Sequence, residues 1–222
     1  RNLGPPMTYC VALKLNAGLV LLSDTRTNAG LDNIATYRKM FFFEEPGERV
    51  IAIMTAGSLS VTQTTISRLR EAIEDPDADG RTSIMRIASQ CSDLKQSQAS
   101  ASMIVAGQRA GGDMRLFLVY PEGNHIEATE DTPYLQIGEH KYGKPILDRV
   151  VTPATSLEDA QKAALLSMDS TMKSNLSVGM PLDLAVIERD ACRVSAKRRI
   201  MPADAQFSAM SDAWSEALRD AF

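Results

Sequence analysis

Thr8, in the first part of the chain, is of a type that can act as a nucleophile, and two charged residues, Asp24 and Lys39, follow it. A threonine at the start of a chain has a hydroxyl and an α-amine on the same residue. Because a free α-amine has a pKa of about 7.7 to 8.0, part of it is neutral near pH 7 and can take the hydroxyl proton, directly or through a water. Thr8 gains such an amine once Met7 and everything before it are removed.

The elements that would position these residues are strands. From Met7 onward the sequence predicts a tight β-hairpin, with Thr8 at its mouth and Asp24 at the end of its second strand. Lys39 follows at the start of another apolar strand, in TYRKMFFF. The apolar positions of the hairpin are Val11, Leu13, Leu15 and Leu19 to Leu22, with the turn glycine Gly18 between them. Taken alone, Thr8 reads as a β-favouring residue that begins a strand.

Taken in this order, the motifs resemble those of proteasome β-type subunits, which have an N-terminal Thr, an Asp in an SDxR-like sequence and a Lys opening the next strand. Within that superfamily the chain is similar to the bacterial Anbu (ancestral beta subunit) group. The similarity runs through MTYCVALKL, LLSDTRTNAGLD, YRKMFFF, IGEHKYGKPILDR and SNLSVGMPLDL, nearly the whole chain from Met7. It implies an α+β fold, the four-layer αββα sandwich of N-terminal-nucleophile hydrolases.

The resemblance also implies catalytic roles. Thr8 would be the nucleophile and, through its amine, the general base. Lys39 would lower the cost of forming an alkoxide on Thr8, and an ion pair with Asp24 would hold Lys39 charged and oriented. Gly57, after the next strand, would donate its backbone N–H to the oxyanion. Without the resemblance, the two charged residues would form a surface ion pair contributing about 0 to 1 kcal/mol, and Gly57 would be a turn residue.

Two segments depart from the proteasome pattern. Glu139, in IGEHKYG, stands where proteasome subunits have a serine that helps to hold the amine, and a carboxylate there would raise the amine pKa. In the second segment Ser177 matches the family's serine, whereas Ser174 replaces its aspartate. Both departures are typical of the Anbu group, and they weaken the inference of ordinary peptidase activity. Ser177 also fits a plain turn serine.

Composition sets further limits. The chain has 222 residues, 44% hydrophobic and 23% charged, which suits one compact domain, expected over residues 7–222. The net charge of -4 does not favour nucleic acid or an acidic membrane surface as a partner. The leading RNLGPP, residues 1–6, reads as a vector remnant, with a short propeptide as the alternative.

Cysteine and histidine usage predicts no metal and no cofactor. The three cysteines are far apart and odd in number, which fits a reducing cytoplasm. His125 and His140 have no third ligand at a zinc-like spacing. No apolar run reaches the length of a membrane span, so we expect a soluble, cytoplasmic protein.

The remaining pattern predicts alternating groups of strands and helices. Strands are expected over 37–43 and 49–55 and in SMIVAG, MRLFLVYP, NHIEAT, YLQIG and PLDLAVIE. Helices are expected after Ser58 or Ser60, from Thr82 or Ser83, near Tyr142, over 157–174 and over 207–221. The KRR run at 197–199 reads as a solvated strand end. By itself this order indicates a layered α+β protein.

The resulting prediction is a self-assembling threonine hydrolase, a peptidase or amidase that forms an acyl-enzyme on Thr8. The resemblance implies a homo-oligomer, either a ring or an open spiral, acting on peptide or amide substrates, and the sequence identifies no partner ATPase. Two alternatives stay open, because a shared fold does not fix function. One is an oligomeric scaffold with a silent threonine, and the other is a hydrolase of small amides.

Overall fold

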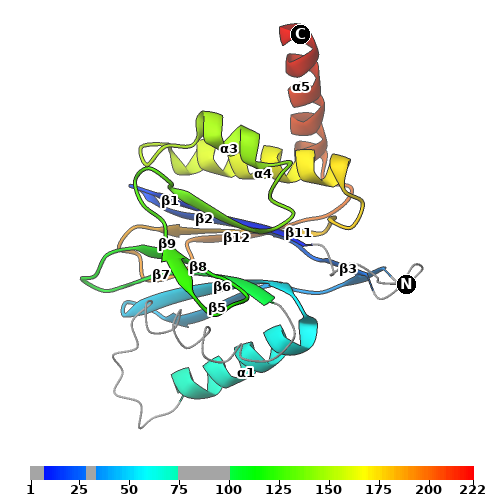
Figure 1. Cartoon of the computed structure of the whole chain (residues 1–222). Helices are drawn as coiled ribbons and strands as arrows, with labels where there is room; N and C mark the ends of the chain where they lie inside the picture. The colour runs from blue at the N-terminus through cyan, green and yellow to red at the C-terminus, as the bar shows by residue number, and fades with distance from the viewer. Residues whose placement is uncertain (1–7, 29–33, 75–100) are drawn as a thin grey trace.

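Two antiparallel sheets, stacked face to face, form the centre of the molecule (Figure 1). The computed structural model describes residues 8–28, 34–74 and 101–222. Residues 1–6 and the helix predicted from Thr82 or Ser83 lie outside these ranges.

In the described part of the chain, each of these two sheets has five strands. The first sheet runs in the order β10 (Tyr134–Gly138), β1 (Tyr9–Leu15), β2 (Gly18–Asp24), β11 (Leu182–Glu188) and β12 (Ala196–Ile200). The second runs in the order β5 (Met40–Glu45), β6 (Arg49–Gly57), β7 (Ala101–Arg109), β8 (Arg115–Val119) and β9 (His125–Glu127). β3 (Arg26–Asn28) and β4 (Ile34–Thr36) pair separately.

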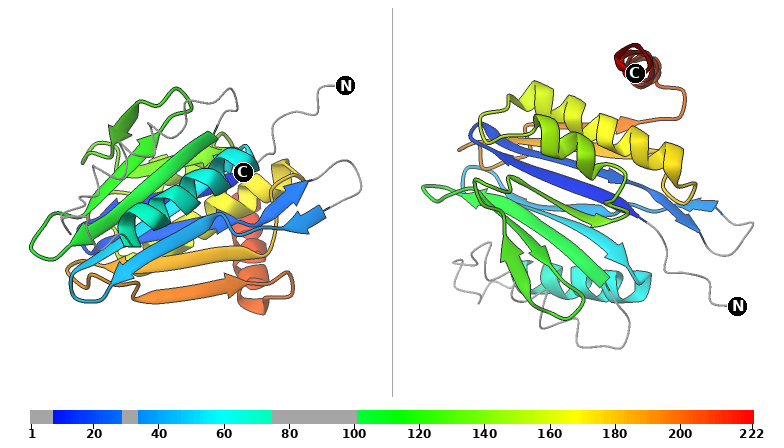
Figure 2. Two further views of the ribbon diagram at one scale, coloured as in Figure 1. Left: turned by 90° about the horizontal axis from the view of Figure 1, so that it is seen from below. Right: turned by 45° about the horizontal axis from the view of Figure 1, so that its top comes forward.

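Helices cover the outer faces of both sheets. α3 (Lys144–Val150) and α4 (Leu157–Ser174) lie across the first sheet, and α1 (Leu59–Glu74) lies across the second (Figures 1 and 2). The layers are therefore helix, sheet, sheet, helix, which confirms the predicted αββα sandwich. Among the described residues, none of the helices is long and apolar enough to cross a lipid bilayer.

The central hairpin β1–β2 is buried on both faces. Successive strand residues point to opposite sides of a sheet. Val11, Leu13 and Leu22 pack toward α4, whereas Ala12 and Leu21 pack between the two sheets. This double burial explains why the hairpin reads as two nearly continuous apolar runs. It also fixes the start of β1 and the end of β2, where Thr8 and Asp24 lie, next to the space between the sheets.

Several element boundaries differ from the prediction. The strand expected from Tyr37 begins only at Met40, because the Tyr37 N–H donates to Thr25 O (2.8 Å) outside the sheet. The β3–β4 pair was not predicted, since three-residue strands show no periodicity. α4 spans the predicted range, and Ser156 caps it by accepting the Asp159 N–H.

The edge strand β12 carries the KRR run on exposed positions. Each of its three cations forms an ion pair, Lys197 with Glu44, Arg198 with Asp204 and Arg199 with Asp183. This arrangement fits the predicted solvated strand, and charges on an edge strand oppose unwanted strand pairing.

The last helix, α5 (Ala205–Ala221), extends away from the sandwich (Figure 1). At its base Lys173 of α4 donates to Ser211 (2.9 Å), and Phe207 is buried. Farther along, Leu218 is 53% exposed. Much of the predicted apolar face of α5 is therefore left outside the core.

A pH-dependent stability follows from Tyr9, which is buried with its hydroxyl 2.6 Å from Gln136 Nε2 and 3.1 Å from Ser167 Oγ. Burial raises the pKa of the Tyr9 phenol to about 12, against about 10 in an unfolded chain. The folded state keeps this proton longer, so the free energy of unfolding is unaffected below pH 10 and falls above it. Between pH 8 and pH 11 this loss should be about 1.4 kcal/mol.

Denaturant titrations of the wild type and Tyr9→Phe at these two pH values measure the effect. We expect Tyr9→Phe to be less stable at pH 8 but to lose less stability than the wild type on going to pH 11. Equal losses in the two proteins would contradict the assignment.

Candidate active site

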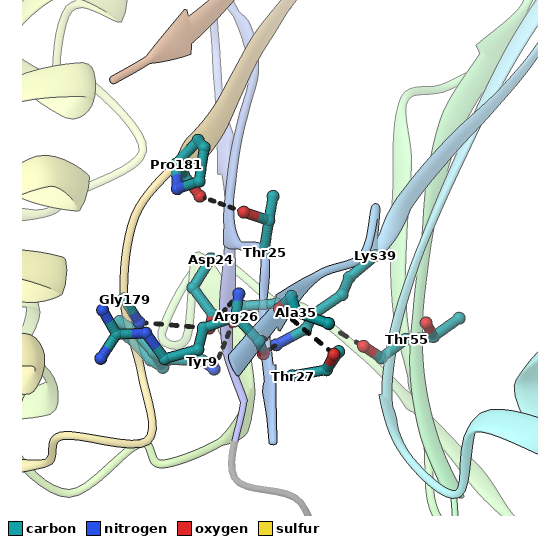
Figure 3. Close-up of polar contacts among 11 residues, drawn as sticks. Tyr9, Asp24, Thr25, Arg26, Thr27, Ala35, Lys39, Thr55, Gly179 and Pro181 are labelled. Atoms are coloured by element: carbon teal, nitrogen blue, oxygen red, sulfur yellow. Dashed lines mark hydrogen bonds and ion pairs between the residues drawn. The ribbon is translucent and has the colours of Figure 1, made fainter. Parts of the chain in front are cut away.

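Asp24 and Lys39 form a buried ion pair at the end of β2 (Figure 3). Lys39 Nζ lies 2.7 Å from Asp24 Oδ1 and 2.7 Å from the carbonyl oxygen of Arg26. Asp24 is fully buried and Lys39 is only 4% exposed. The pair is therefore shielded from water, and the small energies typical of surface pairs do not apply to it.

Backbone N–H groups complete the surroundings of the Asp24 carboxylate. It accepts hydrogen bonds from Tyr9 (3.2 Å), Arg26 (3.2 Å) and Gly179 (3.4 Å). Burial raises the pKa of the Asp24 carboxyl, while Lys39 and the N–H groups of Tyr9 and Gly179 act to lower it. Because a buried charge is tolerated only when it is paired and hydrogen-bonded, this set of donors is what allows a carboxylate at this position.

Thr8 immediately precedes β1 and is held through its carbonyl. The Glu139 N–H donates to Thr8 O at 2.7 Å. Gly138 has φ of +81°, and a Cβ added to it would lie 1.7 Å from Thr8 O. Only glycine fits both the backbone angle and the space. Gly138 was not among the predicted site residues, although it is part of the quoted segment IGEHKYG.

A pocket of about 150 Å³ brings three of the predicted residues together, Thr8, Lys39 and Gly57. Gly57 ends β6 of the second sheet, so the pocket lies where the ends of both sheets meet. The other lining residues are Arg26, Thr27, Tyr37, Thr55, Ala56, Leu59 and Thr62.

Ser177 and Glu139 are near the site mainly through their backbones. Ser177 lies in the turn between α4 and β11, where its N–H donates to Asn175 Oδ1 (2.9 Å), and the end of this turn reaches Asp24 through Gly179. Neither the Ser177 hydroxyl nor the Glu139 carboxylate forms a hydrogen bond with another described residue. The side-chain roles predicted for these two residues thus stay predictions.

Comparison with known proteins agrees with this geometry. A sequence profile described as "Proteasome subunit" matches residues 8–187. The structure is similar to that of the Anbu (Gly-1) mutant from Hyphomicrobium sp. strain MC1, with 47% identity, a TM-score of 0.93 and coverage of 97% of this chain and 96% of that one. The chain belongs to the proteasome subunit family, in the Anbu group.

Two further Anbu structures extend the comparison. Anbu from Yersinia bercovieri is 42% identical, with a TM-score of 0.91, and the match covers 96% of this chain and 95% of that one. A helical assembly of the Anbu complex from Pseudomonas aeruginosa is 45% identical, with a TM-score of 0.87 and coverage of 96% and 94%. No curated protein sequence matches the chain. The proteasome and Anbu resemblance noted from the sequence is thereby confirmed.

The fit of Gly138 against Thr8 gives a prediction for this Anbu-type subunit. Gly138→Ala should displace the start of β1 and lower the free energy of unfolding by about 1 to 3 kcal/mol, because the added Cβ overlaps Thr8 O and the backbone angle is strained. Denaturant titration measures the change. Gly111→Ala is the matched control, since Gly111 also has a positive φ (+70°) but no atom within 4 Å of its added Cβ. Equal losses in the two variants would mean that strain alone, and not contact with Thr8, determines the effect.

Proposed function

We propose that this Anbu-type subunit is a threonine hydrolase that cleaves peptide or other amide bonds through an acyl-enzyme on Thr8. The observation that carries the proposal is the single pocket lined by Thr8, Lys39 and Gly57, with Lys39 fixed by the buried Asp24. These residues supply a nucleophile, a cation and a backbone donor at one place. The family membership of the chain supports the same chemistry.

The reaction begins with Thr8 as the first residue, after removal of the chain up to Met7. The neutral α-amine takes the proton of Thr8 Oγ1, and the oxygen attacks the substrate carbonyl carbon. The Gly57 N–H stabilises the oxyanion. When the C–N bond breaks, the leaving amine receives the proton from the Thr8 ammonium. Water then attacks the ester, with the α-amine again acting as base, and the released acid restores free Thr8.

Lys39 stabilises the negative charge on Oγ1 in this scheme. A lysine ammonium has three N–H donors, and two of them are engaged by Asp24 and the Arg26 carbonyl. The third is available for the Thr8 oxygen. The cation also keeps the pKa of the nearby amine low, which favours its basic form. A Glu139 carboxylate near this amine would raise the amine pKa. Activity at neutral pH would then depend on the balance between the Lys39 cation and the Glu139 carboxylate.

The pocket disfavours a substrate with a positively charged side chain. A cavity of 150 Å³ in a protein core can hold benzene, and this pocket has a similar volume, about 150 Å³. No carboxylate is present among its described lining residues, whereas Arg26 and Lys39 place two cations there, so a lysine side chain of a substrate would be repelled and unpaired. The hydroxyls of Thr27 and Thr62 donate to backbone carbonyls of Ala35 and Leu59, so neither proton requires an acceptor on the ligand. We therefore expect side chains of leucine to phenylalanine size.

The functional form is a homo-oligomer, either a ring or an open spiral. A helical assembly is the form described for the relative from Pseudomonas aeruginosa, which supports this part of the proposal. The exposed apolar residues of α5, such as Leu218, also support it, because such side chains commonly mark contact surfaces. Active sites enclosed in such an assembly would favour unfolded chains or short peptides.

Intact mass spectrometry tests the proposal. Protein expressed from Met7 is incubated with two peptide epoxyketones that differ only in the residue at the reactive end, leucine or lysine. We expect a chain that begins at Thr8 and one adduct per subunit, formed faster with the leucine probe. Equal rates would refute the pocket assignment alone. A free Thr8 that ignores both probes would refute the hydrolase and favour the scaffold.

A further inference from the structure

Arg26 contacts both charged residues of the site through its backbone. Its N–H donates to Asp24 Oδ2 (3.2 Å), and its carbonyl accepts from Lys39 Nζ (2.7 Å). The position of Arg26 thus helps to set the geometry of the buried pair.

The side chain of Arg26 reaches a different segment, the turn over residues 175–179. Its Nη1 donates to the carbonyl oxygen of Leu176 at 2.6 Å (Figure 3 shows Arg26 beside Gly179). Leu176 is 84% exposed and is not packed in the core, and the arginine contacts this turn through the Leu176 carbonyl. Ser177 is the next residue, and its position depends on this contact.

Gly179, at the end of the turn, contacts both Arg26 and Asp24. A Cβ added to Gly179 would lie 2.4 Å from Arg26 Cζ, so the guanidinium packs directly on its backbone. The Gly179 N–H in turn donates to Asp24 Oδ2, the same oxygen that accepts the Arg26 N–H. Arg26, the turn and Asp24 thus form a closed set of contacts.

We infer that Arg26 is a positioning residue, which holds the Ser177 turn in a fixed place relative to the Asp24–Lys39 pair. The inference rests on the proposed function. Arg26 also lines the Thr8 pocket, and the role assigned here is its hold on the turn through Leu176 and Gly179. An arginine suits this task because its planar guanidinium can lie flat against Gly179 while one N–H reaches a carbonyl. A lysine would supply the charge but not the plane.

A stability cycle tests the contact without any assay of activity. Thermal unfolding is measured for the wild type, Arg26→Ala, Gly179→Ala and the double variant. We expect Gly179→Ala to lower the Tm by several degrees in the wild type and to have little effect in Arg26→Ala, where the guanidinium is gone. The same Tm loss in both backgrounds would show that Gly179 is not packed against Arg26 and would overturn the inference.

A labelling cycle tests the positioning role. The rate of epoxyketone labelling of Thr8 is measured for Arg26→Met, Ser177→Ala and the double variant. We expect each single change to slow labelling on the order of 10-fold, and the double variant to be no slower than the slower single one, because both act through the same turn. Arg26→Lys should recover only part of the rate.

The matched control is Arg149→Met, because Arg149 is an exposed arginine that also donates to a backbone carbonyl, that of Pro145 (2.7 Å). It should label at the wild-type rate. Two results would overturn the positioning role. One is a double variant in which the rate losses of Arg26→Met and Ser177→Ala multiply, and the other is a rate loss in Arg26→Met with none in Ser177→Ala. If the wild type is not labelled, the proposed function and the positioning role both fail, and the Tm cycle still reports separately on the contact.

Discussion

Thr8→Ala should lower the rate of amide hydrolysis by roughly three orders of magnitude or more, because it removes the proposed nucleophile and leaves only substrate binding and the proposed oxyanion donor. The measurement is the turnover of a fluorogenic peptide that carries leucine next to the cleaved bond. It is made on chains that begin at residue 8, verified by intact mass. Folding of the variant is verified by thermal unfolding, and we expect little change in Tm since only a hydroxyl and a methyl are lost.

Thr8→Ser serves as the control for this prediction. Serine keeps both the hydroxyl and the α-amine, so its activity should stay within about 10-fold of that of the wild type. If Thr8→Ala keeps its activity or its probe adduct, another residue is the nucleophile. If Thr8→Ser is as inactive as Thr8→Ala, the threonine methyl has a role that the proposed chemistry does not contain.

Lys39→Met should have the largest effect on stability. The change leaves the Asp24 carboxylate fully buried without its cation, which typically costs about 3 to 5 kcal/mol. Labelling of Thr8 should be abolished at the same time, since the proposed stabilisation of the Thr8 oxygen by Lys39 is lost. Denaturant titration and intact mass give the two readouts.

The double variant Asp24→Asn with Lys39→Met separates stability from chemistry. It removes both charges, so it should be more stable than Lys39→Met alone, because a neutral pair carries no uncompensated buried charge. Its labelling should stay absent. Recovery of labelling in the double variant would show that Lys39 contributes only to the fold. Equal stability of the two variants would show that Asp24 does not remain charged in folded Lys39→Met and would contradict the predicted cost of an unpaired carboxylate.

Much of the fold could be predicted because its signals are local. The β1–β2 hairpin and α4 bury apolar residues that lie close together in the sequence. In the helix these residues recur with a period near 3.6, and in the strands successive residues point to opposite faces. Thr8, Asp24, Lys39 and Gly57 could be proposed because they match the proteasome pattern residue by residue, whereas their positions alone indicated only strand, surface and turn residues. The short strands β3 and β4 were missed because three residues carry too little pattern.

By itself the sequence therefore determined the central hairpin, the residue types at its ends and the resemblance to proteasome subunits. Only the tertiary structure decided that the Asp24–Lys39 pair is buried, that Gly138 must be a glycine against Thr8, and that Arg26 holds the turn of Ser177. These features depend on contacts between distant segments, such as Arg26 and Leu176, which are 150 residues apart. Such contacts form only when the sheets and helices pack, because no property of either segment alone specifies its partner.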